Sequence, residues 1–290
     1  MTSAALPDHV TDPFFGLEDR WLETADNELT HYHAVGAGPA ALFLHGSGTG
    51  VTAAANWWLN LPAIAAGARC IAIDMIGYGQ TVVAPEIGFG VREWAAHAIR
   101  VLDALGIEKS WIVGNSLGGW IALQLTIEHP ERLLGVVSMG TGGGPANAAL
   151  KGLINTQLTE AGVRQTLELF VEDKSIVTDE LVSLRLATAQ NDSASERLQE
   201  VVAARERDRR EVPLDNEALS RLQLPVLLVH GIQDRIIPVG RTHELLDVIP
   251  TADAHLFNRC GHWSQVERAD DFNDLVVSFI GNNSDSLTSS

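Results

Sequence analysis

The residues best suited to chemistry begin with a serine framed by glycines, in the run Gly114-Asn115-Ser116-Leu117-Gly118. An apolar stretch over residues 111–115 leads into it, and an apolar helical pattern over residues 117–128 follows. This order predicts a strand, a tight turn and a helix, with Ser116 at the apex of the turn. Because the helix would point its first N–H groups and the positive end of its dipole at that hydroxyl, we expect Ser116 to be a nucleophile.

A serine hydroxyl needs an adjacent base, which a third group must orient. In this topology the partners follow in the order serine, acid, histidine. Asp234 comes just after an apolar run at 225–230, and His262 comes after a later strand around 254–257. Since the carboxyl ends of parallel strands share one edge of the sheet, we expect both side chains to converge on Ser116. Read singly, the aspartate could cap a turn and the histidine could lie on the surface, but their order favours a catalytic triad.

The oxyanion of an acyl-transfer step needs donors that the fold holds in place. We expect one donor to be the backbone N–H of Leu117, directly after the serine. The second should come from the glycine-rich loop at residues 45–50, which follows an apolar strand at 40–44, and Ser47 is the best candidate there. The alternative is that this loop is only a glycine turn.

Apolar strands alternate with helical patterns on either side of these motifs. Helices are expected at residues 91–105, 117–128 and 269–280, before a small polar tail, 281–290, that we expect to be disordered. The alternation predicts an α/β fold with a mostly parallel sheet covered on both faces. The expected strands are residues 20–23, 29–35, 40–44, 69–74, 111–115, 134–138, 225–230 and 254–257.

The character of the chain changes between the strand at 134–138 and the strand at 225–230. This stretch is helical and charged, with Thr178 placed to cap one helix and a capping box at 193–196 placed to start another. We therefore predict a core domain formed by residues 1–140 and 223–290, and a helical cap or lid domain formed by residues 141–222.

Composition narrows the classes of partner. With 290 residues, 46% of them hydrophobic, the chain suits one large α/β domain with an insertion. A formal net charge of −17 argues against nucleic acid and membrane surfaces as partners, and means that an anionic substrate would need a local cationic anchor. Cys70 and Cys260 suggest reduced thiols in a cytoplasmic protein, and we expect no signal peptide and no membrane span. The histidines lack metal-ligand spacing, so no metal or other cofactor is expected, and His45, His129 and His230 are interpreted as structural or surface residues.

Several separate stretches together resemble the α/β-hydrolase superfamily and, within it, the meta-cleavage product hydrolases. These enzymes cleave a carbon–carbon bond in the ring-opened products of catechol degradation. The resemblance spans about residues 29–280, and the run from Arg259 to Glu267 is its most specific part. The other stretches that carry it are His45–Gly48, Ala55–Trp57, Asp74–Gly79, Gly114–Gly119, Val177–Leu181 with Arg185, and Asp271–Asn273.

The resemblance implies a polar half of the site that holds a dienoate carboxylate. Its members would be Asn56, Asn115, Arg185 and Trp263, beside Gly46 of the glycine-rich loop. Without the resemblance, Arg185 would be interpreted as an ordinary helix-surface arginine. The chemistry gives this arginine a purpose, because a guanidinium beside a 2-oxo-enoate fragment would anchor its carboxylate and stabilise developing negative charge.

The activity implied is hydrolysis of 2-hydroxy-6-oxohexa-2,4-dienoates with an alkyl or aryl group at C6, by a homodimer or larger homo-oligomer. The motifs are more similar to the branch acting on alkyl-substituted products than to the biphenyl branch. The sequence leaves open which C6 substituent is preferred. It also leaves open whether the reaction passes through an acyl-enzyme or through direct attack of water. A carboxylesterase for small esters with the same triad is the alternative. A non-catalytic ligand receptor on this fold is disfavoured by the intact set Ser116, Asp234 and His262.

Overall fold

A computed structural model describes residues 15–48, 50–153, 157–191 and 197–287. Nine strands in these ranges form one sheet in the order β1-β2-β4-β3-β6-β7-β8-β9, with β5 beside β2. The strands are β1 (Arg20–Ala25), β2 (Glu28–Val35), β3 (Ala40–Leu44), β4 (Arg69–Ile73), β5 (Val82–Val83), β6 (Ser110–Asn115), β7 (Leu133–Met139), β8 (Val226–Gly231) and β9 (Ala252–Phe257).

The sheet is parallel from β4 through β3, β6, β7 and β8 to β9, whereas β1, β2 and β5 pair antiparallel at one side. Every residue of β6 and β8 is buried, because helices cover both faces of the central strands. That burial explains why these strands are continuous apolar runs in the sequence. The predicted α/β-hydrolase fold with a mostly parallel sheet is confirmed.

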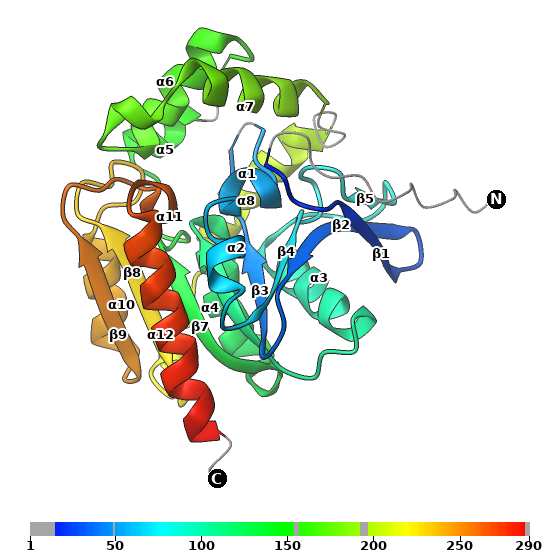
Figure 1. The fold of residues 1–290 in the computed structure, drawn as a ribbon, viewed down its shortest axis with the longest axis vertical. Helices are drawn as coiled ribbons and strands as arrows, with labels where there is room; N and C mark the ends of the chain where they lie inside the picture. Colours follow the sequence, from blue (N-terminus) through cyan, green and yellow to red (C-terminus); the bar gives the residue numbers. More distant parts are fainter. Residues whose placement is uncertain (1–14, 49, 154–156, 192–196, 288–290) are drawn as a thin grey trace.

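Two layers of helices enclose the sheet (Figure 1). On one face, α3 (Val91–Ala104), α4 (Leu117–Glu128) and α10 (Gly240–Val248) contribute to one apolar cluster. On the other face lie α1 (Ala53–Trp57), α2 (Leu61–Ile64) and α12 (Ala269–Leu287), which pack in a second cluster. Within the described ranges, no helix combines the length and apolar character needed to cross a membrane. The remaining short elements are η1 (Pro130–Arg132), η2 (Lys174–Ile176), α9 (Asn216–Leu219) and α11 (Ser264–Glu267).

In the described residues, five α-helices follow β7 before the chain returns to the sheet at β8. Figure 1 shows α5 (Ala148–Leu153), α6 (Glu160–Phe170) and α7 (Asp179–Asn191) beyond one end of the sheet. Thr178 caps α7 as predicted, since its hydroxyl oxygen accepts a hydrogen bond from Leu181 N at 3.2 Å. The predicted capping box at 193–196 lies outside the described residues.

The fourth of these helices, α8 (Leu198–Glu211), is fastened to the core. The Asp208 carboxylate accepts a hydrogen bond from Val91 N at 2.7 Å and so caps α3 from another helix. Arg197 donates to Ile87 O at 2.8 Å, and its guanidinium lies 4.3 Å from the ring centroid of Phe89. The helical segment is therefore joined to the core by contacts of α8. Its proposed limits, residues 141 and 222, stay a prediction.

The end of the chain departs from expectation. The tail was predicted to be disordered from residue 281, but α12 continues to Leu287, so the prediction is wrong for residues 281–287. No proline interrupts this stretch, and Asn283 donates through Nδ2 to Phe279 O at 2.8 Å, a bond along the helix surface. Gly281 alone does not stop a helix already nucleated by a buried apolar stripe.

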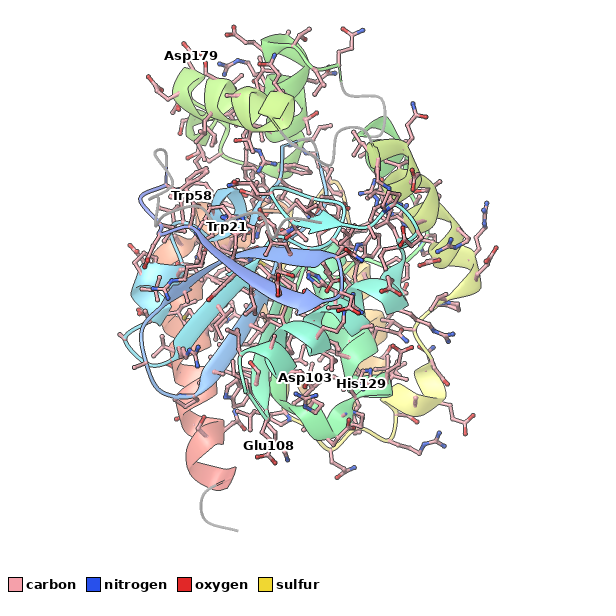
Figure 2. The ribbon with its side chains drawn as sticks, turned by 90° about the vertical axis from the view of Figure 1, so that its right-hand side faces the viewer. Trp21, Trp58, Asp103, Glu108, His129 and Asp179 are labelled. Atoms are coloured by element: carbon pink, nitrogen blue, oxygen red, sulfur yellow. The ribbon has the colours of Figure 1, made fainter. Side chains whose placement is uncertain are left out.

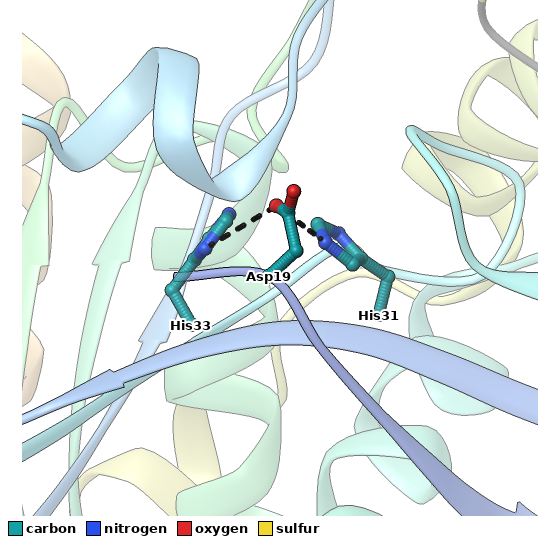
Figure 3. A group of neighbouring side chains, drawn as sticks. All are labelled: Asp19, His31 and His33. Atoms are coloured by element: carbon teal, nitrogen blue, oxygen red, sulfur yellow. Dashed lines mark hydrogen bonds and ion pairs between the residues drawn. The ribbon is translucent and has the colours of Figure 1, made fainter. Parts of the chain in front are cut away.

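One carboxylate and two histidines form a buried group on one face of β2 (Figure 3). Asp19, His31 and His33 place one ligand-type atom each within 4.8 Å of one another, a grouping that sequence spacing did not reveal. His31 is held between two carboxylates, with Nε2 3.0 Å from Asp19 Oδ1 and Nδ1 2.8 Å from Asp74 Oδ2. His33 donates through Nδ1 to Glu18 O at 2.9 Å. The group thus ties the first strands to the loop that follows β4.

Charge accounts for the stability of this arrangement. Burial by itself lowers the pKa of His31, but the charges and hydrogen bonds of Asp74 and Asp19 raise it to about 9. Burial likewise opposes ionisation of Asp74, yet the charge of His31 holds the pKa of that carboxyl well below its usual range. Asp74 also accepts from Ala53 N at 2.7 Å, at the start of α1. The same charge network therefore fixes the helix that carries Asn56.

The raised pKa of His31 predicts a pH-dependent stability. A histidine near 6.5 when unfolded and about 9 when folded stabilises the fold fully below pH 6.5, and this contribution disappears as pH rises through about 9. We expect the free energy of unfolding to fall by on the order of 3 kcal/mol over that window, measured by urea unfolding from pH 6 to pH 10. His31→Gln should flatten the profile, whereas His243→Gln, at an exposed position, should not. Equal profiles for the two variants would contradict the assignment.

Candidate active site

The turn between β6 and α4 holds Ser116 in a strained conformation. Its φ of +55° and ψ of −106° lie in a region where residues other than glycine are rare. The flanking glycines permit the turn: a Cβ at Gly118 would lie 2.2 Å from Leu44 O, and a Cβ at Gly114 would lie 2.2 Å from Gly118 O. Ser116 N donates to Met139 O at 2.8 Å. This is the geometry of a nucleophile elbow.

The two other predicted triad residues meet at the end of the sheet. Asp234 accepts from Ile236 N at 2.8 Å and from Ile237 N at 2.9 Å through Oδ1, and its Oδ2 lies 2.6 Å from Nδ1 of His262. Because an ionised carboxylate only accepts, the imidazole donates from Nδ1 and keeps Nε2 as the basic nitrogen. Burial favours the neutral acid, but the charge of His262 and hydrogen bonds from His230 and His262 hold the pKa of Asp234 well below its usual range.

Ser116 and His262 line one small pocket beneath the cap helices. Leu117 follows the serine as the first residue of α4, and Asp234 lies behind His262, so both predicted residues are next to the lining. The structure brings all the other predicted site residues into the lining itself. The lining consists of Gly46, Ser47, Val51, Asn56, Asn115, Ser116, Phe170, Arg185, His262 and Trp263.

Two lining residues, Val51 and Phe170, were missed by sequence reasoning. The Phe170 ring centroid lies 5.0 Å from that of Trp263 and 5.7 Å from that of His262. Phe170 belongs to a helical pattern with no recognisable motif, so nothing local marks it. Its backbone carbonyl accepts from Trp263 N at 3.1 Å, which joins the end of α6 to the loop that carries His262.

The loop at 45–48 is held from three sides. His45 donates through Nδ1 to Gly46 O at 2.7 Å, and its Nε2 accepts from Met75 N at 3.1 Å. Gly46 N donates to Asn56 Oδ1 at 3.3 Å. Ser47 therefore sits on a fixed backbone in the pocket, next to the predicted nucleophile. Its role as an oxyanion donor, together with Leu117 N, stays a prediction.

The same pocket is rich in buried hydrogen-bond donors. Arg185 is 2% exposed, and its Nε and Nη1 have no hydrogen-bond partner among the described residues. The same holds for Nδ2 of Asn56 and Nδ2 of Asn115. Burial lowers the pKa of Arg185 to about 10, so the guanidinium remains charged at neutral pH. It lies 5.4 Å from the ring centroid of Trp263.

Such a set of buried donors is complementary to an anion. A buried N–H group without an acceptor is unfavourable by about 1–3 kcal/mol, more for a charged group, so four in one pocket favour a ligand that supplies acceptor oxygens. The interpretation of Arg185 as a helix-surface residue is wrong, because α7 turns this side chain into the pocket. The positive charge it carries there offsets the net negative charge of the chain.

A second, larger pocket of about 760 Å³ lies between α7 and the start of α2. Its lining includes Trp58, Leu181 and Val266 and contains neither Ser116 nor His262. Figure 2 shows Trp58 close to the helices that follow β7, while His129 lies toward the opposite end of the molecule. The smaller pocket is therefore the candidate active site.

The comparisons with known proteins agree with this geometry. A family profile described as the alpha/beta hydrolase fold matches residues 39–269. The fold, the elbow and the Asp234–His262 pair define the same class, and the chain belongs to this family.

Closer relatives identify the branch. The chain is 39% identical over 254 residues to 2-hydroxymuconate semialdehyde hydrolase of Pseudomonas sp. (strain CF600), covering 87% of this chain and 90% of the relative. It is 33% identical to 2-hydroxy-6-oxo-6-phenylhexa-2,4-dienoate hydrolase of Burkholderia cepacia, covering 96% and 99%. A solved meta-cleavage product hydrolase from Pseudomonas fluorescens IP01 superposes with a TM-score of 0.84 at 35% identity, covering 91% and 97%. The chain is a member of the meta-cleavage product hydrolases, serine-type enzymes that act on carbon–carbon bonds.

The geometry predicts how the nucleophile responds to a covalent probe. A fluorophosphonate should label the protein once, on Ser116, and Ser116→Ala should abolish labelling, as followed by mass spectrometry of the intact chain. Asp234→Asn should slow turnover by about 10⁴-fold, because the amide favours the wrong tautomer of His262. Ser183→Ala, at an exposed serine of α7, serves as the matched control and should label normally. Labelling of Ser116→Ala at the wild-type rate would disprove the assignment.

Proposed function

We propose that the chain hydrolyses the C5–C6 bond of 2-hydroxy-6-oxohexa-2,4-dienoates carrying an alkyl or aryl group at C6. The products are 2-hydroxypenta-2,4-dienoate and a carboxylic acid. The observation that carries this proposal is a set of buried donors without partners, on Arg185, Asn56 and Asn115. These residues line one pocket together with Ser116 and His262. The names of the relatives support the same reaction class.

The donor side of the pocket suits the dienoate half of the substrate. Arg185 binds the C1 carboxylate, and the amide groups of Asn56 and Asn115 donate to its oxygens. A carbon leaving group departs only if its electron pair is delocalised. The 2-oxo-3-enoate fragment formed by ketonisation accepts that pair, and the nearby guanidinium stabilises the resulting negative charge.

The triad side performs the proton transfers. His262 takes the proton of the C2 hydroxyl and delivers a proton to C5, which yields the keto form. It then accepts the Ser116 proton as Oγ attacks C6, while Leu117 N and Ser47 hold the oxyanion. The C5–C6 bond breaks, the fragment takes up the proton from His262, and water releases the acid from Ser116. In the alternative route, His262 activates a water molecule that attacks C6 directly. Trapping of an acyl-enzyme on Ser116 distinguishes the first route from this one.

A carboxylesterase with the same triad is the alternative. A small neutral ester would use Ser116 and the oxyanion donors but would leave the charged group of Arg185 without an acceptor. The buried arginine therefore favours the dienoate. Burial of an unpaired guanidinium is unfavourable, and a neutral ester supplies no charged group to compensate it.

Arg185→Ala separates these two functions. We expect it to lower kcat/KM for the dienoate by about 10²–10³-fold, since a charged hydrogen bond to the carboxylate is lost, and to leave p-nitrophenyl acetate hydrolysis within about threefold. Turnover is followed by loss of the visible absorbance of the 6-methyl and 6-phenyl dienolates. The ratio of the two rates ranks alkyl against aryl groups at C6.

The matched control is Arg235→Ala, an exposed arginine that pairs with Glu172 at 3.0 Å. It should leave both activities unchanged. Wild-type protein that turns over the ester briskly and neither dienolate would assign the chain to the esterases.

We also infer that the protein works in the cytoplasm as a homodimer or larger homo-oligomer. Both cysteines, Cys70 and Cys260, are buried free thiols, and burial raises the pKa of each to about 12, which suits a reducing compartment. Oligomerisation is supported by membership of the family, and light scattering on the purified protein measures it.

A further inference from the structure

A second histidine contacts the acid of the predicted triad. His230, in β8, is completely buried, and its Nε2 lies 3.1 Å from Asp234 Oδ2. This is the same oxygen that lies 2.6 Å from Nδ1 of His262. The sequence indicates only a structural or surface position for His230, because nothing in its spacing relates it to the nucleophile.

The neighbours of His230 determine which of its nitrogens carries the proton. Nε2 lies 2.9 Å from Ile237 O and 3.1 Å from Asp234 Oδ2, and both of these oxygens can only accept. Nε2 therefore bears a hydrogen and shares it between them. Nδ1 lies 2.7 Å from Thr242 Oγ1. Contacts on both sides of the ring therefore fix its orientation.

We propose that His230 is a positioning residue for the carboxylate of Asp234, and this inference rests on the triad proposed above. Two backbone N–H groups hold Oδ1 of Asp234, whereas side chains alone hold Oδ2. The N–H of His230 prevents the carboxylate from rotating about its Cβ–Cγ bond. As a second donor to Oδ2, this N–H also weakens the electrostatic attraction between Oδ2 and His262.

Two effects follow if this donor is removed. The carboxylate gains rotational freedom, so the imidazole of His262 is held less firmly toward Ser116, and kcat falls. The negative charge on Oδ2 is then concentrated on His262, which favours the imidazolium and moves the acidic limb of the pH–rate profile to higher pH. Asp234 and His262 are the titratable groups that face His230 here, and both are part of the triad.

The test compares His230→Leu with His230→Gln in the full chain. Leucine removes the donor, whereas the side-chain amide of glutamine can donate from a similar position. For His230→Leu we expect kcat for the 6-methyl dienolate to fall by about tenfold or more, with KM within about threefold and the acidic limb displaced upward. The effect should remain below the roughly 10⁴-fold expected on converting the acid itself to an amide. His230→Gln should restore most of kcat and the wild-type limb.

The matched control is His97→Leu, the same change at another fully buried histidine, which contacts Thr30 at 2.8 Å and not the triad. It reports general destabilisation and should leave the acidic limb in place. The rate of fluorophosphonate labelling of Ser116 is measured in parallel as a function of pH. This second readout depends on the triad and not on the dienoate, so failure of the proposed substrate is distinguishable from failure of this inference.

Two results would overturn the proposal. One is wild-type kcat and an unmoved acidic limb in His230→Leu. The other is equal impairment of both variants without any displacement of the limb, which means that the ring only fills space. If His230→Leu does not fold, Thr242→Val removes the hydroxyl that orients the ring. That variant should move the limb in the same direction by a smaller amount, and an unchanged limb in it also rejects the proposal.

Discussion

The close approach of α4 to the end of β3 is the constraint on which the whole site depends. Gly118 lies so near Leu44 O that no side chain fits between them. This contact forces the sharp turn at Ser116 and brings the glycine-rich loop after β3 beside the nucleophile. The start of α4 and the predicted oxyanion loop are therefore positioned by the same contact, before any substrate binds.

Electrostatics divides the site into two halves with different sources of charge. On the triad side, Asp234 stays ionised because backbone amides and two histidines donate to it in spite of burial. On the other side, Arg185 is charged and has donors to spare. A chain with a net charge of −17 thus keeps one buried cation where an anionic substrate group would bind. The ring of Trp263 lies over that cation, 5.4 Å from its guanidinium carbon.

Much of the fold could be predicted because buried strands are apolar throughout. The expected limits of β3 and α4 agree with the structure. The start of β6 differs by one residue, and β8 is shifted by one residue at both ends. Short elements such as α1 and the two-residue β5 are not predicted from the sequence. An element of so few residues is too short to display a hydrophobic periodicity. The polar end of α12 was mispredicted, because composition says little about a helix that its buried half has already nucleated.

The order of the predicted nucleophile, acid and base follows from the sequence alone, because each comes after a recognisable strand and parallel strands end at one edge. The family motifs likewise predict that Arg185 belongs to the site. The packing of the folded chain is needed to show that this arginine is buried with unpaired donors, that the ring centroid of Phe170 lies 5.7 Å from that of His262, and that His230 contacts Asp234. Such facts depend on how side chains from distant segments pack together, and local periodicity carries no record of that packing.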